Sequence, residues 1–232
     1  MNPQITIGIP AYNQAEYLED AIESAYNQTM PAHEIIIVND GSLDNTQEIA
    51  ERYMFKEFPG VESPVRVINQ VNKGLPSARN TLIMNMTGNY LLPLDADDML
   101  KENAIARITQ EINQTNADIV APSFKEFGKS DRDVILGGFT MDDLKAANRL
   151  GYFSCVRKSA LLEVGGYNPK MKWGWEDWDL WFDLFKRGKT IAVVQEILVM
   201  YRVKEKSMIY EANQHSEELY TQIKKNHPGL FQ

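Results

Sequence analysis

Short apolar runs alternate with segments of helical periodicity through the first half of the sequence. The apolar runs predict strands near residues 5–9, 35–38, 65–68, 89–94 and 118–121. Between them, apolar side chains recur at helical spacing over residues 15–26, 45–53, 75–86 and 100–115. Strands that alternate with helices form parallel sheets with right-handed crossovers and helices on both faces. The sequence therefore predicts an α/β fold whose mostly parallel central sheet is flanked by helices, and it makes the first half a candidate nucleotide-binding fold.

The pattern loosens after residue 122. We expect short helices at residues 141–150 and 177–186, two strands at residues 191–194 and 197–203, and a surface helix at residues 211–225. No repeat and no flexible linker marks an independent second domain, so one domain over residues 1–232 is predicted.

Composition excludes several classes of protein. The chain has 24 Lys and Arg against 32 Asp and Glu, a formal charge of −8, which argues against broad electrostatic binding of nucleic acid. The single cysteine, Cys155, excludes an internal disulfide and fits a reducing compartment. We find neither a signal-peptide pattern nor the roughly 18 consecutive apolar residues of a membrane helix. A soluble, cytoplasmic protein is expected.

Three carboxylates follow the predicted strand at residues 89–94, namely Asp95, Asp97 and Asp98. They lie just past the carboxyl end of a strand, where open α/β sheets bind ligands. Side chains two residues apart on an extended chain point the same way, so Asp95 and Asp97 can face one ligand. Carboxylate oxygens suit Mg²⁺ or Mn²⁺ that bridges the protein to phosphate. The alternative is an acidic helix start, with Asp98 as the cap.

Two further loops carry polar groups suited to a nucleotide. Asp40 ends the second strand and can accept a hydrogen bond from a base, while Gly41 allows close backbone approach; ordinary turn chemistry explains both residues equally well. Lys73 and Arg79 lie at the start of the third helix, where cations and free N–H groups suit a diphosphate. The alternative for this pair is a solvated helix face.

The segment at residues 173–181 combines aromatic rings with acids. Its rings form a surface suited to the faces of sugar rings, and they belong to Trp173, Trp175, Trp178 and Trp181. A carboxylate beside such a surface can act as general base toward a hydroxyl, and we favour Asp177 over Glu176 and Asp179. The alternative is that these acids only complement the dipole of the following helix.

Six segments occur in an order that resembles one enzyme family. They are residues 10–13, 38–42, 72–74 with 79–80, 95–98, 165–167 and 175–179. In this order they resemble the family 2 glycosyltransferases, whose fold is called GT-A and has a Rossmann-like sheet. The likeness covers about residues 4–203. It implies a nucleotide-sugar-binding half to about residue 121, an acceptor and catalytic half at about 122–203, and a helical tail.

The resemblance implies a role for each motif. The nucleobase and ribose would be held by Pro10, Ala11, Tyr12, Asn13 and Asp40. Lys73, Gly74 and Arg79 would lie near the base or diphosphate, and Asp95 and Ala96 near ribose or sugar hydroxyls. Asp97, with Asp95, would bind the metal. Asp177, beside Glu176, would deprotonate the acceptor, and the sugar acceptor would contact Trp173, Trp175 and Trp178.

The implied activity is inverting transfer of a hexosyl or N-acetylhexosaminyl group from a UDP-sugar, with Mn²⁺ or Mg²⁺ as cofactor. The acceptor would be a hydroxyl of a glycan, a lipid-linked glycan or another molecule, as in polysaccharide biosynthesis. A lipid-linked acceptor would require docking on the inner face of a membrane or on a partner protein, through the helix at residues 211–225. The alternatives are an inactive sugar-binding or nucleotide-binding scaffold, and a sugar nucleotidyltransferase. Residues 9–15 lack the Gly, Lys and Arg that the latter predicts.

One position departs from the family pattern. Many members carry a His after a Tyr-Arg pair near the end of the domain, where it adds a metal ligand, but here Lys204 follows Tyr201-Arg202-Val203. A protonated amine cannot bind a cation. We therefore expect Lys204 to contact the diphosphate, so that metal binding is weaker or depends more on nucleotide. The remaining imidazoles, of His33, His215 and His227, are expected in a loop or at the surface.

Overall fold

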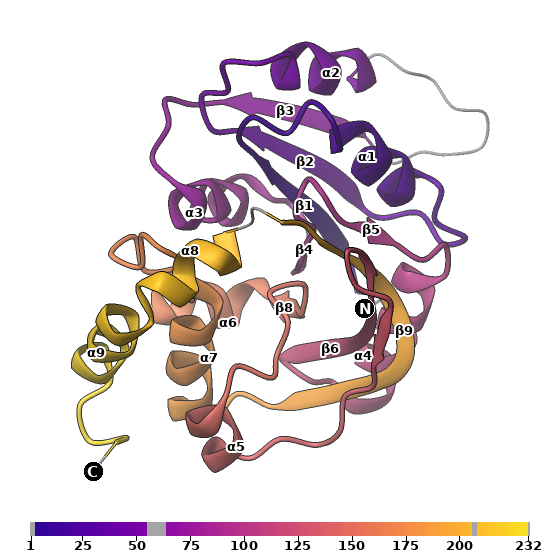
Figure 1. Cartoon of the computed structure of the whole chain (residues 1–232). Helices are drawn as coiled ribbons and strands as arrows, with labels where there is room; N and C mark the ends of the chain where they lie inside the picture. The colour runs from indigo at the N-terminus through magenta and orange to yellow at the C-terminus, as the bar shows by residue number, and fades with distance from the viewer. Residues whose placement is uncertain (1–2, 55–63, 206–207, 232) are drawn as a thin grey trace.

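The computed structural model describes residues 3–54, 64–205 and 208–231, and its strands within these ranges form one sheet (Figure 1). The strands are β1 (Ile5–Ala11), β2 (Glu34–Asn39), β3 (Val65–Asn69), β4 (Tyr90–Pro93), β5 (Met99–Leu100), β6 (Ile119–Gly128), β7 (Arg132–Val134), β8 (Cys155–Arg157) and β9 (Ile191–Val203). Their order across the sheet is β3-β2-β1-β4-β8-β6-β9-β5, with β7 paired to β6.

Helices pack on both faces of this sheet. They are α1 (Leu18–Tyr26), α2 (Thr46–Tyr53), α3 (Leu75–Asn85), α4 (Ala104–Thr115), α5 (Met141–Ala146), α6 (Lys158–Val164), α7 (Glu176–Lys186), α8 (Met208–Gln214) and α9 (Ser216–Asn226). None of these described helices combines the length and the apolar character needed to cross a membrane.

The central pairings are parallel, as predicted. β1 lies between β2 and β4 with parallel register, β3 continues the sheet beyond β2, and β6 pairs parallel with β9. The short strand β8 is antiparallel to both of its neighbours, β4 and β6, and so joins two parallel parts of the sheet. This arrangement confirms the α/β fold.

Two hydrophobic cores explain why the strands are continuous apolar runs. Ile35 and Ile37 of β2 point into one core, which also contains side chains of α1, α2 and α4. Ile36 and Val38 point into the other, with side chains of α3, α6 and α7. Alternate side chains of a strand face opposite sides of the sheet, so burial of both faces removes the polar positions.

Several predicted elements differ from the structure in their boundaries or type, among them the helix expected at residues 141–150, which ends at Ala146 as α5. The two strands expected at residues 191–203 are one strand, β9, because the polar residues 195–196 that interrupt the pattern fall at a register shift opposite Pro122 and Ser123. Leu100, expected to begin a helix, instead forms the strand β5 together with Met99 and pairs antiparallel with β9. Long-range pairing decides the cases of β9 and β5, and a local pattern does not report it.

The predicted surface helix at residues 211–225 is also different. It is two helices, α8 and α9, which lie beside α7 (Figure 1). Ala212, Leu219 and Ile223 are buried in the same core as α7. The C-terminal segment therefore packs against the domain through an apolar face.

Candidate active site

The three acids after β4 lie at the carboxyl edge of the sheet, as predicted, but each has a different environment. The amide of Leu94 donates to the carbonyl oxygen of Gly8 at 2.9 Å, and the amide of Asp98 donates to that of Asp95 at 3.0 Å, which closes the turn. Asp98 is buried and accepts hydrogen bonds from the Tyr152 hydroxyl at 2.5 Å and the Arg202 amide at 2.6 Å. The alternative of Asp98 as a helix cap was wrong, since α4 begins at Ala104.

Asp95 is held by the buried side chain of Arg79. Nη2 of Arg79 donates to Oδ1 of Asp95 at 2.8 Å, and Nη1 pairs with Oε1 of Glu176. The Arg79 side chain is 1% exposed, and its guanidinium lies over the rings of Tyr152 and Tyr167. Burial raises the pKa of Asp95 to about 6, although Arg79 opposes the rise. The alternative of Arg79 on a solvated helix face was wrong, and its contact with a diphosphate stays a prediction.

Asp97 pairs with the lysine that departs from the family pattern. Nζ of Lys204 lies 2.5 Å from Oδ2 of Asp97, and the two side chains are 22% and 20% exposed. The end of β9 brings them together, because Nε of Arg202 donates to the carbonyl oxygen of Asp97 at 2.8 Å. Lys204 is therefore in contact with the predicted metal ligand.

The loops after β1, β2 and β3 are joined by hydrogen bonds at the same edge. The Asp40 carboxylate is buried and accepts from the amides of Lys73 at 2.9 Å and Gly74 at 2.8 Å, and from Nε2 of Gln70 at 2.6 Å. A Cβ on Gly41 would lie 2.8 Å from the amide nitrogen of Asn72, so glycine permits the two loops to approach. Asp40 thus fixes the loop that carries Lys73, and its contact with a nucleobase stays a prediction.

The first loop contributes exposed groups beside these. Pro10 and Ala11 end β1, and the Ala11 carbonyl oxygen accepts from the Asp40 amide at 2.8 Å. Tyr12 is 44% exposed, and Asn13 accepts from the Leu43 amide at 2.8 Å through its side-chain oxygen. The structure thus brings the four residues 10–13 next to Asp40, while the side chain of Lys73 extends into solvent.

A cavity of about 470 Å³ lies between the end of β4 and the start of α7. Asp95 and Arg79 line it together with Asp177, and the Trp175 and Trp178 rings line it as well. Met208 and Ala212 of α8 also contribute to its wall. Two motifs that lie some eighty residues apart in the sequence therefore meet in one cavity.

Asp177 lies in the first turn of α7 and remains partly exposed. Its Oδ2 accepts from Nδ2 of Asn148 at 3.0 Å, and its Oδ1 accepts from the Trp178 amide at 2.8 Å. Burial raises the pKa of the Asp177 carboxyl, while Arg79 and these hydrogen bonds oppose the rise. Glu176 is instead buried against Arg79. Among the residues that the structure describes, Asp177 therefore differs from its neighbour, because its carboxylate lines the cavity and forms no ion pair.

The four tryptophans do not form one exposed surface. Trp181 is 0% exposed and belongs to the core, and Trp178 is buried with its Nε1 donating to the Leu144 carbonyl oxygen at 2.8 Å. Trp175 is partly buried at the cavity, and Trp173 is exposed and stacks on the His215 ring at a centroid distance of 4.3 Å. The expectation that Trp181 shares a sugar-binding wall was wrong, because helical spacing turns this ring toward the sheet.

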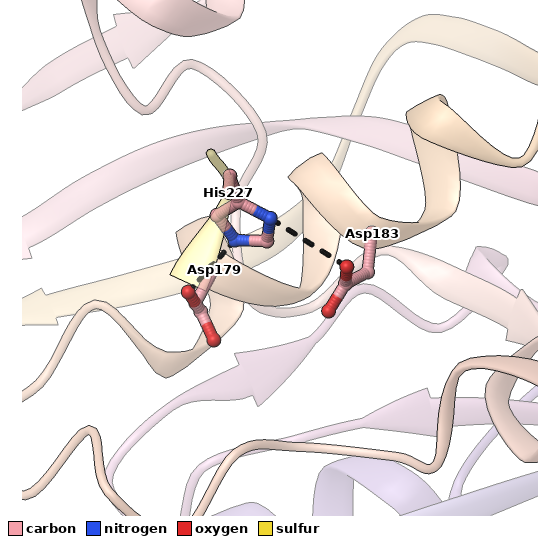
Figure 2. A group of neighbouring side chains, drawn as sticks. All are labelled: Asp179, Asp183 and His227. Carbon is pink, nitrogen blue, oxygen red and sulfur yellow. Dashed lines mark hydrogen bonds and ion pairs between the residues drawn. The ribbon is translucent and has the colours of Figure 1, made fainter. Parts of the chain in front are cut away.

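A second cluster of polar side chains ties α7 to the end of α9, and Figure 2 shows its three members. Nε2 of His227 lies 2.8 Å from Oδ1 of Asp179, and Nδ1 lies 3.5 Å from Oδ1 of Asp183. The expectation that His227 is a surface residue was wrong, since its side chain is 0% exposed. No periodicity signals this contact, because His227 follows the last turn of α9.

The contacts of this cluster indicate a structural role, which is to join α7 to the end of α9. Its three ligand atoms lie close enough together for a metal ion. However, Asp179 already accepts from Nδ2 of Asn226 at 2.8 Å and Nδ2 of Asn168 at 3.0 Å. Nζ of Lys186 lies 3.3 Å from Nδ1 of His227, which puts a positive charge where a cation would have to bind. These contacts satisfy the buried carboxylate without a metal.

Comparison with known proteins adds a family and a fold. A family model described as glycosyl transferase family 2 matches residues 6–163. GlyG, a glycosyltransferase of Streptococcus pneumoniae serotype 4, is 36% identical over 132 residues, which are 56% of this chain and 42% of GlyG. The matched segments make up 18%, 42% and 35% of three such curated relatives, so the chain spans less than half of their length.

Solved structures agree at the level of the fold. TarS of S. aureus, in complex with UDP-GlcNAc, superposes with a TM-score of 0.80 and 18% identity over 96% of this chain and 66% of that chain. The mannosyltransferase PcManGT of Pyrobaculum calidifontis, in complex with GDP-Man and Mn²⁺, gives a TM-score of 0.75 and 15% identity over 97% of this chain and 65% of that chain. The GT-A fold that the order of motifs predicts is confirmed.

Proposed function

This chain belongs to glycosyl transferase family 2, and we propose that it is an inverting, metal-dependent enzyme that moves a sugar from a UDP-sugar to an acceptor hydroxyl, with Asp177 as general base. One observation carries the proposal: Asp95 of the acidic turn and Asp177 of α7 line the same cavity. The residue proposed to contact the donor and the residue proposed to activate the acceptor would therefore act in one cavity.

The donor would lie along the joined loops at the carboxyl edge of the sheet. Tyr12 offers an exposed ring to a base, and Lys73 offers an exposed ammonium to a diphosphate. Asp40 is hydrogen-bonded to both loops, through the amides of Lys73 and Gly74 and through the Ala11 carbonyl oxygen. These bonds would hold the two loops in position before the donor binds. TarS, which shares the fold, is described with UDP-GlcNAc and with UDP, and PcManGT with GDP-Man, which supports a nucleotide-sugar donor.

Asp97, with Asp95, would hold Mn²⁺ or Mg²⁺. Carboxylate oxygens are the ligands that these ions prefer, and Asp97 is the acid whose partner is a partly exposed side chain rather than a buried one. The residues therefore fit a divalent ion once Lys204 moves. When bound, the ion would stabilise negative charge on the departing diphosphate.

Asp177 would take the proton from the acceptor hydroxyl as its oxygen attacks the anomeric carbon. Attack comes from the face opposite the diphosphate, the bond between the anomeric carbon and the phosphate oxygen breaks, and the configuration inverts. The raised pKa of Asp177 makes it a stronger base than an ordinary aspartate. Asn148, which donates to Oδ2, would orient the carboxylate.

The division of the domain into halves follows from these roles. We assign donor binding to about residues 1–121, and acceptor binding and the base to about residues 122–203, followed by the helical tail. Sugar faces of the acceptor or donor would pack on Trp175 and Trp178, which line the cavity, and on the exposed ring of Trp173, which precedes the lining residue Gly174. A glycan hydroxyl is the proposed acceptor, and a chondroitin synthase of Pasteurella multocida is among the relatives, with 30% identity over 81% of this chain.

Calorimetric titration of the purified chain with UDP and with GDP, each with and without Mn²⁺, tests the donor assignment. We expect UDP to bind more tightly than GDP and to bind more tightly with Mn²⁺ than without it. Tighter binding of GDP would reassign the donor and keep the enzyme class. If neither nucleotide binds under any condition, the proposal fails. Turnover of a panel of UDP-sugars then identifies the sugar.

A further inference from the structure

The ammonium of Lys204 pairs with the carboxylate of Asp97, which is the ligand proposed for the metal. We propose that its ammonium competes with the divalent ion for Asp97, and that a nucleoside diphosphate weakens this competition by offering the ammonium another anion, so that metal and nucleotide bind cooperatively. The inference rests on the proposed function, because it assigns the metal to Asp97. It rests directly on the 2.5 Å contact between Nζ of Lys204 and Oδ2 of Asp97.

Asp97 is the exchangeable acid of the three. Asp95 is paired with Arg79, whose side chain is buried and also bound to Glu176. Asp98 is buried and hydrogen-bonded to the Tyr152 hydroxyl and to a backbone amide. Removing either of these partners would leave a buried charge unsatisfied. The Lys204 side chain, by contrast, is 22% exposed and can move into water or onto an anion.

The end of β9 keeps Lys204 near Asp97 before any ligand binds. Arg202 is fixed to the acidic turn by two hydrogen bonds, from its amide to Oδ1 of Asp98 at 2.6 Å and from Nε to the carbonyl oxygen of Asp97 at 2.8 Å. Its guanidinium also lies 4.6 Å from the centroid of the Tyr17 ring. Lys204 follows two residues later, and its Nζ lies 4.9 Å from the centroid of the same ring. The local concentration of this ammonium at Asp97 is therefore high.

A divalent ion and the ammonium exclude one another. Both would bind Oδ2 of Asp97, and the positive charge of the ammonium would repel a divalent cation at this position and weaken its binding. A diphosphate reverses this balance, since it adds negative charge that can pair with Lys204 while its oxygens bind the ion. By linkage, the nucleotide then strengthens metal binding by the same factor by which the metal strengthens nucleotide binding.

Titration of the full chain with Mn²⁺, followed by the electron paramagnetic resonance signal of free Mn²⁺, tests the competition without an activity assay. We compare wild type with Lys204→Met, which keeps the apolar stem and removes the charge, in the absence and presence of UDP. Lys129→Met is the matched control, because Nζ of Lys129 pairs with Glu205 at 2.6 Å on the surface nearby and does not reach Asp97.

Without UDP, we expect Lys204→Met to bind Mn²⁺ about threefold or more tightly than wild type, as for loss of a partly screened ion pair. Lys129→Met should match wild type. The enhancement of Mn²⁺ binding by UDP should be smaller in Lys204→Met. The inference is overturned if wild type and Lys204→Met bind Mn²⁺ equally in the absence of UDP, or if UDP enhances binding equally in both.

Failure of the proposed function gives a different result. If the proposed function is wrong, wild type binds neither UDP nor GDP. The competition at Asp97 is instead tested by comparing Mn²⁺ binding to wild type and to Lys204→Met in the absence of nucleotide. A thermal melt of each variant, with Tm equal to that of wild type, ensures that the comparison is made on folded protein.

Discussion

Arg79 and Asp95 form an ion pair, with 2.8 Å between Nη2 and Oδ1, at a guanidinium whose side chain is 1% exposed. The same guanidinium pairs with Glu176, the residue before the proposed base. One buried cation from α3 therefore links the end of β4 to the first turn of α7. This link sets the position of Asp177 relative to the acidic turn.

Replacing Arg79 by Met should destabilise the chain strongly, because it leaves the carboxylates of Asp95 and Glu176 uncompensated. We expect a loss of about 3–5 kcal/mol in the free energy of unfolding, measured by urea denaturation. Arg107→Met is the control, since Arg107 and Glu196 form an ion pair at 2.6 Å whose side chains are both more than a third exposed. That change should cost about 1 kcal/mol or less. Equal losses in the two variants would contradict the account.

The pH dependence of turnover should report the environment of Asp177. The base must be deprotonated, so the rate falls as the pH is lowered through its pKa, which burial raises above the usual value of about 3.9. Asn148 stabilises the charged form by donating to Oδ2. In Asn148→Ala the acid limb of kcat/KM should therefore move to higher pH.

Asn103→Ala is the matched control for this shift. Nδ2 of Asn103 donates to Oε1 of Glu196 at 2.6 Å, so the change removes the same kind of hydrogen bond away from the cavity. The profile of this variant should match wild type. An acid limb that stays in place in Asn148→Ala would show that Asn148 does not tune the base.

Removing the imidazole of His227 should loosen the C-terminal helices. Asp179 then loses one of its buried hydrogen-bond partners, at an expected cost of about 1–3 kcal/mol in the free energy of unfolding. Hydrogen exchange over residues 216–226 should rise in His227→Ala. His33→Ala is the control, because His33 is only partly buried and contacts Thr87 at 3.0 Å.

The contact between Asp179 and His227 also predicts that the protein becomes less stable at low pH. Burial alone would raise the pKa of Asp179, but hydrogen bonds from His227, Asn226 and Asn168 outweigh it and lower the pKa. The stabilisation is therefore present above the ordinary pKa of about 3.9 and is lost as the pH falls toward the lower folded-state pKa. This acid-side loss should shrink in His227→Ala. A fall in stability on adding EDTA at neutral pH that occurs in wild type and not in His227→Ala would instead assign a metal to the cluster.

The sequence predicted the fold best where both faces of a strand are buried. The run Ile35–Ile36–Ile37–Val38 has one interpretation as a strand of this length, and its side chains do divide between the two cores. Prediction failed where an element depends on a distant partner. Met99 and Leu100 form a strand only because β9 lies beside them, and a bulge rather than a turn accommodates the polar interruption of β9.

The sequence predicted where the site residues lie, but it did not predict which of them form ion pairs with one another. Residues at the carboxyl ends of β1, β2, β3 and β4 do lie at one edge of the sheet, because parallel strands share that edge. The carboxylate that each cation contacts depends on three-dimensional geometry. Arg79 and Lys204 were both expected at a diphosphate, and the structure pairs them with Asp95 and Asp97.

The central claim is that Asp177 acts as general base in sugar transfer. Its most direct test is Asp177→Asn, with sugar transfer and nucleotide Kd measured on the same preparation. We predict a loss of about 100-fold or more in transfer rate, with the Kd for UDP unchanged. The control is Asp142→Asn, since Asp142 is exposed and contacts only Lys145 among the described ion pairs; it should retain wild-type activity. Transfer by Asp177→Asn at the wild-type rate would contradict the account.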